Sequence, residues 1–456
     1  MKKRYRMAIG VGVCTLLATQ SVQAKEEAFP LNTIDGEKAE GQHYVPSTLE
    51  NVRWGELPNR TSSPVLKMKS GETVTFDTVS AEGILDDQGR DPVTYFGQYG
   101  VESDEVLTDA IDIAASNMEN IFGEQGPHVV TGPVEIEGAE PGDVLKVETL
   151  TLTPRVPYGV ISNRHDRGAL PGEFPENEGP EEGASAENPE LYNNVSVFTP
   201  ITERDGDWYG EIPGEDVFFP LEPFMGMMGV ATDTTERVDS VPPTHTGGNI
   251  DINDLGEGSA LYLPIEVDGG MFYTGDPHFA QGDGEVALSA LEGSLRVTFR
   301  LTLLKDGDPA IPGDANAFTH PVGETDDYWL PIGLDEDLNE AMRDATRQSI
   351  SLLEHQYGMD RANALAYLSA ATDYEVSQVV DRTKGINGKI RKADFERNKE
   401  SEPALAKEED TGGVLPDTSA NQATWIVSGL LLSIIGLSGV LWKRRRQSKG
   451  KSEAGL

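Results

Sequence analysis

Apolar and polar positions alternate in short runs through the first three quarters of the chain. The clearest runs are ETVTFDTV at 72–79, PVEIEG at 133–138, DVLKVETLTLT at 143–153 and SLRVTFRLTLL at 294–304. Successive side chains of a strand point to opposite faces of a sheet, so a period of two indicates strands with one buried face. The β-branched residues within these runs and the Gly or Pro at their ends predict strands of a sandwich or barrel.

Apolar spacing of three to four residues appears only towards the end of the chain. It predicts helices at Leu338–Tyr357 and Ala362–Leu368, the first of them ending at Gly358. The stretch Glu173–Glu190 is acidic and aperiodic, and it is predicted to be a solvated surface loop. The predicted fold class is therefore mainly β, a β-sandwich-like domain with a small C-terminal helical part.

Both ends of the chain carry patterns that are typical of export and anchoring. Residues 1–24 have basic residues before an apolar run that is too short to span a bilayer, which predicts a signal peptide cleaved after Ala24. The segment Thr424–Trp442 is uncharged and long enough to cross a hydrocarbon core of ~30 Å as one transmembrane helix. A basic tail follows it, and positive residues stay cytoplasmic, so the preceding chain is expected outside the cell.

A short motif directly before the predicted transmembrane helix resembles a sortase sorting signal of the LPxT type. Ser stands where the commonest version has Gly, and the motif consists of Leu415, Pro416, Asp417, Thr418 and Ser419. The order of motif, apolar helix and basic tail predicts that a sortase joins the protein to the peptidoglycan of a Gram-positive cell. The expected division is a signal peptide at 1–24, a tether at 25–42, the main domain at 43–395, a linker at 396–414, the sorting signal at 415–446 and a cytoplasmic tail at 447–456.

Composition narrows the partners and the chemistry. Lys and Arg number 37 against 77 Asp and Glu, a formal net charge of −40. A surface this acidic repels nucleic acid, so no nucleic-acid partner is expected. Cys14, the only cysteine, lies in the predicted signal peptide, which excludes disulfides and a Cys nucleophile from the mature chain. No nucleophile elbow, Walker loop, HExxH pair or dinucleotide fingerprint occurs in the sequence.

Polar side chains are densest in the segment GDPHFAQGDGE at 275–285. Its glycines let the backbone turn tightly, and its polar residues are Asp276, His278, Gln281, Asp283 and Glu285. Carboxylates beside an imidazole can ligate a divalent metal that activates water, or one of them can act directly as the general base. The alternatives are a calcium-like structural loop and an ordinary turn.

Two further Gly-rich breaks hold candidate residues. His128 lies in GPHVVTGP, while THTGGNIDIND carries His245, Asn249 and Asp251. Asn249 could donate a hydrogen bond to a developing oxyanion, a contribution of roughly 3–4 kcal/mol in known hydrolases. A turn formed by Gly-Gly-Asn is the alternative interpretation.

Taken in order, these motifs resemble the acetamidase/formamidase family. The resemblance rests on GAEPGDVL at 138–145, GGNIDIND at 247–254 and GDPHFAQGDGE at 275–285, within matches that run from about residue 43 to 395. It implies hydrolysis of formamide, acetamide or a similar short amide to the carboxylic acid and ammonia. It also implies a β-sandwich-like fold and a homo-oligomer.

The resemblance further implies that the motif residues line one pocket. We expect Asp276, His278 and Asp283 to hold a divalent metal ion, zinc or calcium, or a water molecule, and Glu285 to move protons. The remaining candidates are assigned to catalysis (His128, His245, Asn249) and to substrate binding (Gln281, Asp251).

Several features depart from the usual pattern of that family, namely the export signal, the anchor, the acidic insertion and extra residues around 103–124. The alternative hypothesis is therefore a non-catalytic, wall-anchored β-sandwich that binds carbohydrate or calcium.

Overall fold

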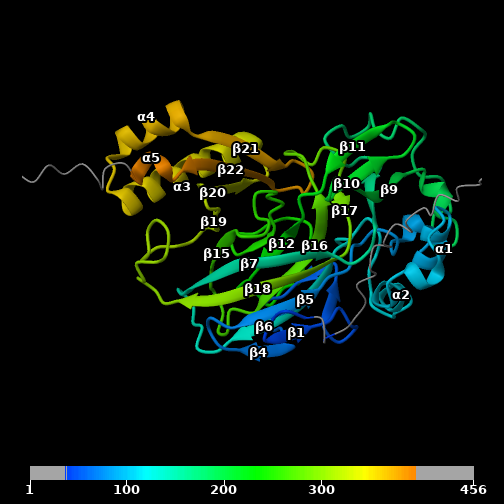
Figure 1. The fold of residues 1–456 in the computed structure, drawn as a ribbon, viewed down its shortest axis with the longest axis horizontal. Helices are drawn as coiled ribbons and strands as arrows, with labels where there is room; N and C mark the ends of the chain where they lie inside the picture. Colours follow the sequence, from blue (N-terminus) through cyan, green and yellow to red (C-terminus); the bar gives the residue numbers. More distant parts are fainter. Residues whose placement is uncertain (1–35, 37–38, 397–456) are drawn as a thin grey trace, which may run out of the picture. The chain divides into compact units, whose positions relative to one another are not determined.

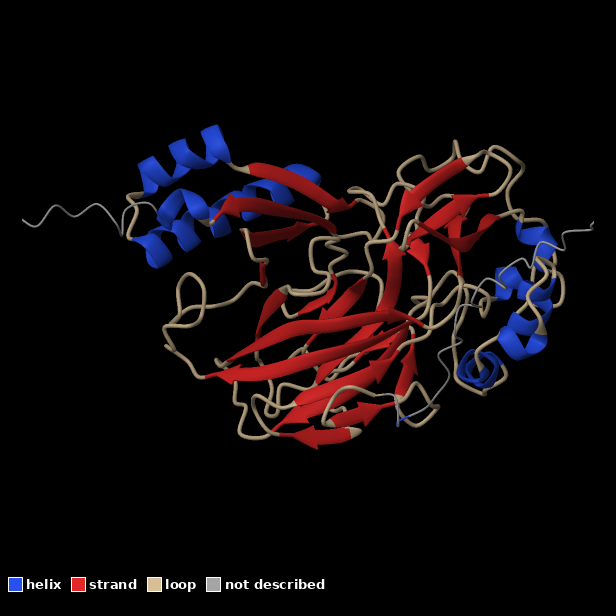
Figure 2. Ribbon diagram, viewed as in Figure 1, coloured by secondary structure: helices blue, strands red, loops and turns tan. Residues whose placement is uncertain are grey.

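A computed structural model describes residue 36 and residues 39–396 of the chain. Within this part, the strands form a nine-stranded sheet, an eleven-stranded sheet and a two-stranded pair of β3 (Glu56–Leu57) and β13 (Val238–Asp239). Helices lie at the margins of the strands (Figure 2). They are α1 (Pro92–Gly97), α2 (Thr108–Ala114), α3 (Leu338–Tyr357), α4 (Arg361–Ala371) and α5 (Ala393–Glu396), with 3-10 turns η2 (Asp86–Gln88), η3 (Ser103–Glu105) and η4 (Pro189–Tyr192).

The nine-stranded sheet is built around the long antiparallel pair of β7 and β18, which run side by side in Figure 1. Its strand order is β1 (His43–Val45), β5 (Thr73–Asp77), β18 (Leu295–Leu304), β7 (Val144–Pro154), β15 (Ala260–Pro264), β19 (Val322–Glu324), β20 (Tyr328–Asp335), β22 (Lys384–Arg391) and β21 (Asp373–Gln378).

The eleven-stranded sheet has β16 near its centre. Its main order is β11 (Val217–Pro220), β10 (Asp207–Ile212), β9 (Val195–Arg204), β8 (Tyr158–Asn163), β17 (Leu291–Glu292), β16 (Phe272–Ala280), β12 (Phe224–Gly229) and β14 (Gly247–Asn249). β6 (Val129–Ile136) pairs with β16 and carries β2 (Val52–Trp54) and β4 (Leu66–Met68) on the same sheet.

Three buried aromatic rings join the two large sheets. Phe76 and Phe299 come from β5 and β18 of one sheet, and Phe272 comes from β16 of the other. The ring of Phe272 lies 5.9 Å from that of Phe76 and 5.5 Å from that of Phe299, both in edge-to-face geometry. These contacts link the inner faces of the two sheets. The prediction of a mainly β fold with a few helices is confirmed.

The strands predicted from alternating runs are present. The four runs at 72–79, 133–138, 143–153 and 294–304 correspond to β5, the end of β6, β7 and β18. The acidic stretch 173–190 is a largely exposed loop, as predicted.

The two predicted helices are also present, as α3 and α4. Asp337 caps α3 by accepting hydrogen bonds from the backbone N–H groups of Asn339 and Glu340, and Gly358 ends it in the left-handed conformation at φ 65°. Figure 1 shows α3, α4 and α5 grouped beside β20, β21 and β22.

One expectation about local structure is wrong. The segment 275–285 was expected to be a Gly-rich break, but its first half belongs to the buried strand β16. Pro277 has no N–H to donate, and the pairing of β16 with β17 shifts register between His278 and Ala280. The pattern looked unlike a strand because this strand is buried along both faces and interrupted by Pro.

The predicted signal peptide, sorting signal, transmembrane helix and cytoplasmic tail lie outside the described residues. In the described part of the chain, no helix combines the length and apolar character needed to cross a membrane.

Candidate active site

Strand β16 places two polar side chains on one face of the eleven-stranded sheet. Asp276 and His278 are two residues apart, so they point to the same side. On one neighbouring strand, β17, Glu292 pairs with His278. On the other, β12, the pairing of Met225 with Pro277 and of Met227 with Gly275 sets Gly226 opposite Asp276.

His278 lies between carboxylates. Its Nε2 is 3.1 Å from Asp276 Oδ2 and 3.1 Å from Glu292 Oε1, while its Nδ1 is 4.0 Å from Asp251 Oδ1. A second imidazole approaches from the start of β6, with His128 Nε2 3.8 Å from Asp276 Oδ1. All of these side chains are buried.

Glu285 and Asp381 extend the group. Among the described residues, three sets of side chains each bring their possible ligand atoms within 4.8 Å of one another: Asp251, Asp276 and His278; His278, Glu285 and Glu292; and Asp251, Glu285 and Asp381. Because the sets share members, they form a single buried cluster, called the carboxylate cluster below. It consists of Asp251, Asp276, His278, Glu285, Glu292 and Asp381.

The electrostatics of the carboxylate cluster follow from burying many acids around one base. Burial opposes the charge of Asp276, but His278 and His128 lower its pKa to about 2. Burial likewise opposes the charge of His278, but Glu292 and Asp276 raise its pKa well above the ordinary value. Both shifts come from the mutual attraction of the Asp276 carboxylate and the His278 imidazole, which lie 3.1 Å apart.

The other acids of the carboxylate cluster resist ionisation. Burial, followed by repulsion from neighbouring carboxylates, raises the pKa of Asp251 and of Glu285 well above their ordinary values. Burial also raises the pKa of Glu292 and of Asp381 to about 7 each. Groups that titrate near neutral pH in a buried site are suited to moving protons.

Several polar atoms of the carboxylate cluster point at one another without forming hydrogen bonds. Both carboxylate oxygens of Asp251, both ring nitrogens of His278 and Oε2 of Glu292 have no hydrogen-bond partner among the described residues. Buried polar groups are nearly always satisfied, and unsatisfied ones often mark an ion. These donors, imidazole nitrogen and carboxylate oxygen, fit a divalent metal ion.

The backbone is strained at three members of the carboxylate cluster. Asp251, Asp276 and Glu285 have φ values of 47°, 51° and 46°, in the left-handed region that non-glycine residues rarely adopt. Such strain collects at functional sites, because the surrounding structure must hold it.

Gly226 has no side chain, and the space that a Cβ atom would need there is occupied by the carboxylate cluster. A Cβ atom at this position would overlap Oδ1 of Asp251, and it would lie 2.7 Å from His278 Cε1 and 2.9 Å from Asp276 Oδ2. Any larger residue here must displace at least one of these side chains.

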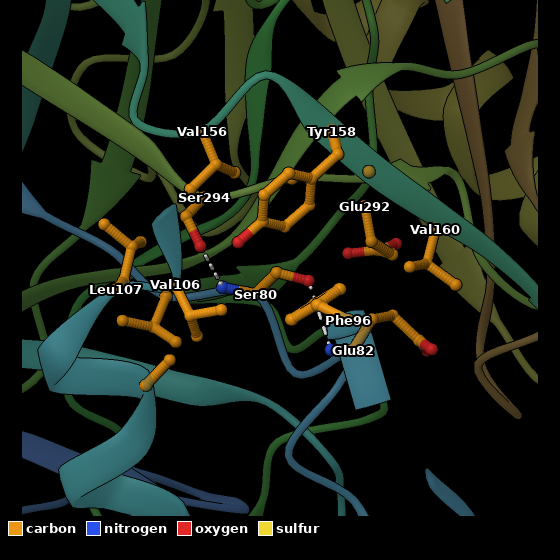
Figure 3. A pocket seen from close by; sticks show the side chains of 14 residues that line it. Ser80, Glu82, Phe96, Val106, Leu107, Val156, Tyr158, Val160, Glu292 and Ser294 are labelled. Carbon is orange, nitrogen blue, oxygen red and sulfur yellow. Dashed lines mark hydrogen bonds between the residues drawn. The ribbon is translucent and has the colours of Figure 1, made fainter. Parts of the chain in front are cut away.

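A cavity of about 360 Å³ opens onto the carboxylate cluster. This volume lies in the usual range of small-molecule sites. Its inner end is lined by cluster members Asp276, Glu285, Glu292 and Asp381, together with His128 and Asn249. Figure 3 shows Glu82 and Glu292 on the wall of a second cavity of about 20 Å³, which has room for about one water molecule.

Most of the predicted site residues meet at this place. Asp276, His278, Glu285 and Asp251 belong to the carboxylate cluster, while His128 and Asn249 line the cavity beside it. His128 is held by its Nδ1, which lies 2.9 Å from Ser240 Oγ. Asp251, assigned to substrate binding, is fully buried and faces His278 instead.

Three predicted residues neither belong to the carboxylate cluster nor line the cavity. His245 lies on the surface, where its Nε2 is 2.6 Å from Glu266 Oε1. Asp283 is exposed and accepts a hydrogen bond from Asn253, so it is not a member of the carboxylate cluster. Gln281 donates to the backbone carbonyls of Asp251 and Ser377, which makes it a support for the chain behind the site.

Glu292 and Asp381 were missed. Both stand in segments that resemble the family, ALSALE and VVDRTKG, but neither is surrounded by the glycines and histidines that marked the other candidates. Only the pairing of β17 with β16, and the turn between β21 and β22, bring them to His278.

Comparison with known proteins finds similarity to one family. Residues 225–387 match the model of the Acetamidase/Formamidase family. The formamidase of Methylophilus methylotrophus is 27% identical over 300 residues, which cover 56% of this chain and 73% of that protein. The acetamidase of Mycolicibacterium smegmatis is 26% identical over 221 residues, covering 40% of this chain and 54% of that protein. The chain thus spans about half the length of some of the curated relatives it matches.

A solved structure shares the fold. The acetamidase of Bacillus halodurans superposes with a TM-score of 0.57 and 25% sequence identity, over 78% of this chain and 99% of that one. The family match, the relatives and this structure together support the assignment that the motifs suggested.

Proposed function

We propose that the chain is a member of the acetamidase/formamidase family and hydrolyses linear amides to the carboxylic acid and ammonia. The carrying observation is the buried contact of Asp276 with His278 at 3.1 Å, among the other acids of the carboxylate cluster, at the inner end of a cavity. The names of the relatives, formamidase and acetamidase, support a short amide as substrate.

The carboxylate cluster is suited to a divalent metal ion, zinc or calcium. Asp251, Asp276 and His278 would hold it, because their donor atoms are buried and aimed at one another without hydrogen bonds. Such an ion supplies Lewis acidity, polarising a carbonyl oxygen or lowering the pKa of water towards ~7.

The protein's own groups supply the proton transfers. Glu285, with its raised pKa, lines the cavity beside Asp276 and is assigned the role of taking a proton from water as it attacks the amide carbon. The same proton passes to the nitrogen when the C–N bond breaks, so ammonia leaves and the oxygen of water stays in the carboxylic acid. Asn249 is assigned as a hydrogen-bond donor to the carbonyl oxygen.

Hydrolysis is tested by incubating the purified full-length protein with formamide, acetamide and propionamide in the presence of zinc or calcium. Ammonia and carboxylate in equal amounts support the proposal. No ammonia from any amide would favour the alternative, a wall-displayed sandwich that binds carbohydrate or calcium, which the comparisons do not support.

Gly226→Ala is expected to lower kcat/KM for acetamide by about a hundredfold, because displacing reacting groups by ~1 Å has an effect of this size. Gly97→Ala in α1 is the matched control, since a Cβ there meets nothing within 4 Å. Thermal unfolding of both variants shows whether the fold is kept. A folded Gly226→Ala protein with wild-type kinetics would mean that the arrangement of the carboxylate cluster is not needed.

The sorting signal remains the basis of a proposal about location. Leu415–Ser419 before an apolar segment and basic residues supports attachment to peptidoglycan by a sortase. Digestion of the wall is expected to release the protein from intact cells, and release by detergent alone would contradict wall attachment.

An oligomer of identical chains is proposed from the family resemblance, and gel filtration with light scattering tests it.

A further inference from the structure

The cavity is larger than a short amide needs. Its volume of about 360 Å³ has room for on the order of ten water molecules at ~30 Å³ each. Acetamide carries a single methyl group beside its amide and would leave most of this space to solvent. The part of the cavity away from the carboxylate cluster is called the outer cavity below, and it includes the residues Phe122, Arg164, Pro180 and Tyr192.

An aromatic pair forms one side of the outer cavity. The rings of Phe122 and Tyr192 meet edge to face with their centroids 4.9 Å apart, and both are only partly exposed. The guanidinium of Arg164 lies 5.9 Å from the ring centre of Phe122. Further apolar residues, Leu85 and Leu288, line the same cavity. These groups offer a surface on which an apolar or aromatic substituent can pack.

The lining of the cavity runs from this aromatic pair to the carboxylate cluster. Arg164, beside Phe122, pairs with Glu82 at 3.0 Å between Nη1 and Oε1. Glu82 and Glu292 both line the large cavity, and they also share the wall of the small one (Figure 3). The outer cavity is therefore continuous with the site where the amide would react.

The aromatic side of the outer cavity is built by segments outside the part of the chain that matches the family model. Phe122, Arg164 and Tyr192 all precede residue 225, where the match begins, whereas Asp276, Glu285, Glu292 and Asp381 lie inside 225–387. The acids of the reacting end thus come from the matched region, and the aromatic pair that would contact a larger substituent comes from other segments.

Charges on the outer cavity are largely matched. Arg164 is paired with Glu82 and also with Asp87, whose Oδ2 lies 2.7 Å from Nε. Arg382 is paired with Asp239 at 2.8 Å. Arg167 donates to the carbonyl of Gly123. Because Arg164 and Arg382 are already paired with carboxylates, a neutral substituent suits this surface better than an anionic one.

We propose that the preferred substrate is an amide whose acyl group carries a neutral aromatic or bulky apolar substituent, seated against Phe122 and Tyr192. This inference rests on the proposed amidase function. It assigns Phe122 as a residue that determines specificity.

The test compares kcat/KM for phenylacetamide and acetamide, using metal-supplemented full-length protein. The wild type is expected to prefer phenylacetamide by at least about tenfold, and Phe122→Ala is expected to lower the ratio of the two values by about tenfold, since small changes in apolar contact have effects of this size. Tyr99→Ala is the control, because Tyr99 is an exposed ring stacked on Phe198 and does not line the cavity. It is expected to leave the ratio unchanged.

The outcomes separate this inference from the proposed function. Equal kcat/KM values for acetamide and phenylacetamide overturn the inference but not the proposed amidase function. The same holds if a folded Phe122→Ala protein keeps the wild-type ratio of the two kcat/KM values. Preference for a carboxylate-bearing amide, lost in Arg167→Ala, also overturns it. No ammonia from any amide overturns both.

Discussion

Asp276→Asn is expected to lower ammonia release from acetamide by about a thousandfold or more while the protein stays folded. The carboxylate of Asp276 lies 3.1 Å from His278, as that of Glu292 does. Among the acids of the carboxylate cluster, Asp276 is the one whose pKa is lowered. Removing its charge takes away an ionised candidate ligand of the metal and the carboxylate that lies 3.1 Å from His278. Loss of several kcal/mol of stabilisation of the transition state corresponds to such a factor, at ~1.4 kcal/mol per tenfold.

Asn is chosen because it keeps the shape of the side chain and tolerates the left-handed backbone at φ 51°. Asp205→Asn is the matched control, an exposed aspartate at φ 57° in the turn between β9 and β10. It is expected to show wild-type rates. If Asp276→Asn retains wild-type turnover, the reaction takes place somewhere else on the protein.

Removal of divalent metal is expected to stop ammonia release and to lower the melting temperature of the full-length protein. An ion held at a thousand times its Kd stabilises the folded state by about 4 kcal/mol. Loss of the ion would also restore the repulsion among acids that raises the pKa of Asp251 and of Glu285. Differential scanning calorimetry and an ammonia assay, each with and without a chelator, measure both effects.

His278→Ala supplies the control for metal removal. This variant loses the one imidazole shared by two of the three ligand sets, so a chelator is expected to leave its melting temperature unchanged. The wild-type protein is treated with the chelator and then dialysed. If it keeps its activity and its melting temperature after this treatment, the site does not depend on a metal.

The sequence predicts the regular parts of this fold well and the site only in part. The runs that became β7 and β18 alternate because one face of each is less buried than the other, and α3 carries its own cap at Asp337 and stop at Gly358. Strand β16 has no such alternation, because nearly all of its residues are buried, and Pro277 interrupts its hydrogen bonding.

Proximity along the chain misled the interpretation of individual site residues. Asp283 lies two residues before Glu285, yet the turn between them exposes one side chain and buries the other. His245 stands four residues before Asn249, but it faces solvent beside Glu266, while Asn249 lies on β14 next to β12. Glu292 and Asp381 reach His278 through strand pairing and a distant turn, which no local pattern in the sequence reveals.

The central claim is that the carboxylate cluster binds the reacting amide at the inner end of the cavity. A crystal structure of the full-length protein with acetohydroxamate, an amide analogue that chelates metal ions, tests it most directly. Difference density for the hydroxamate is expected next to an ion held by Asp276 and His278, with the methyl group towards the outer cavity. Density for the analogue only at another place, such as the surface pair of His245 and Glu266, would contradict the account.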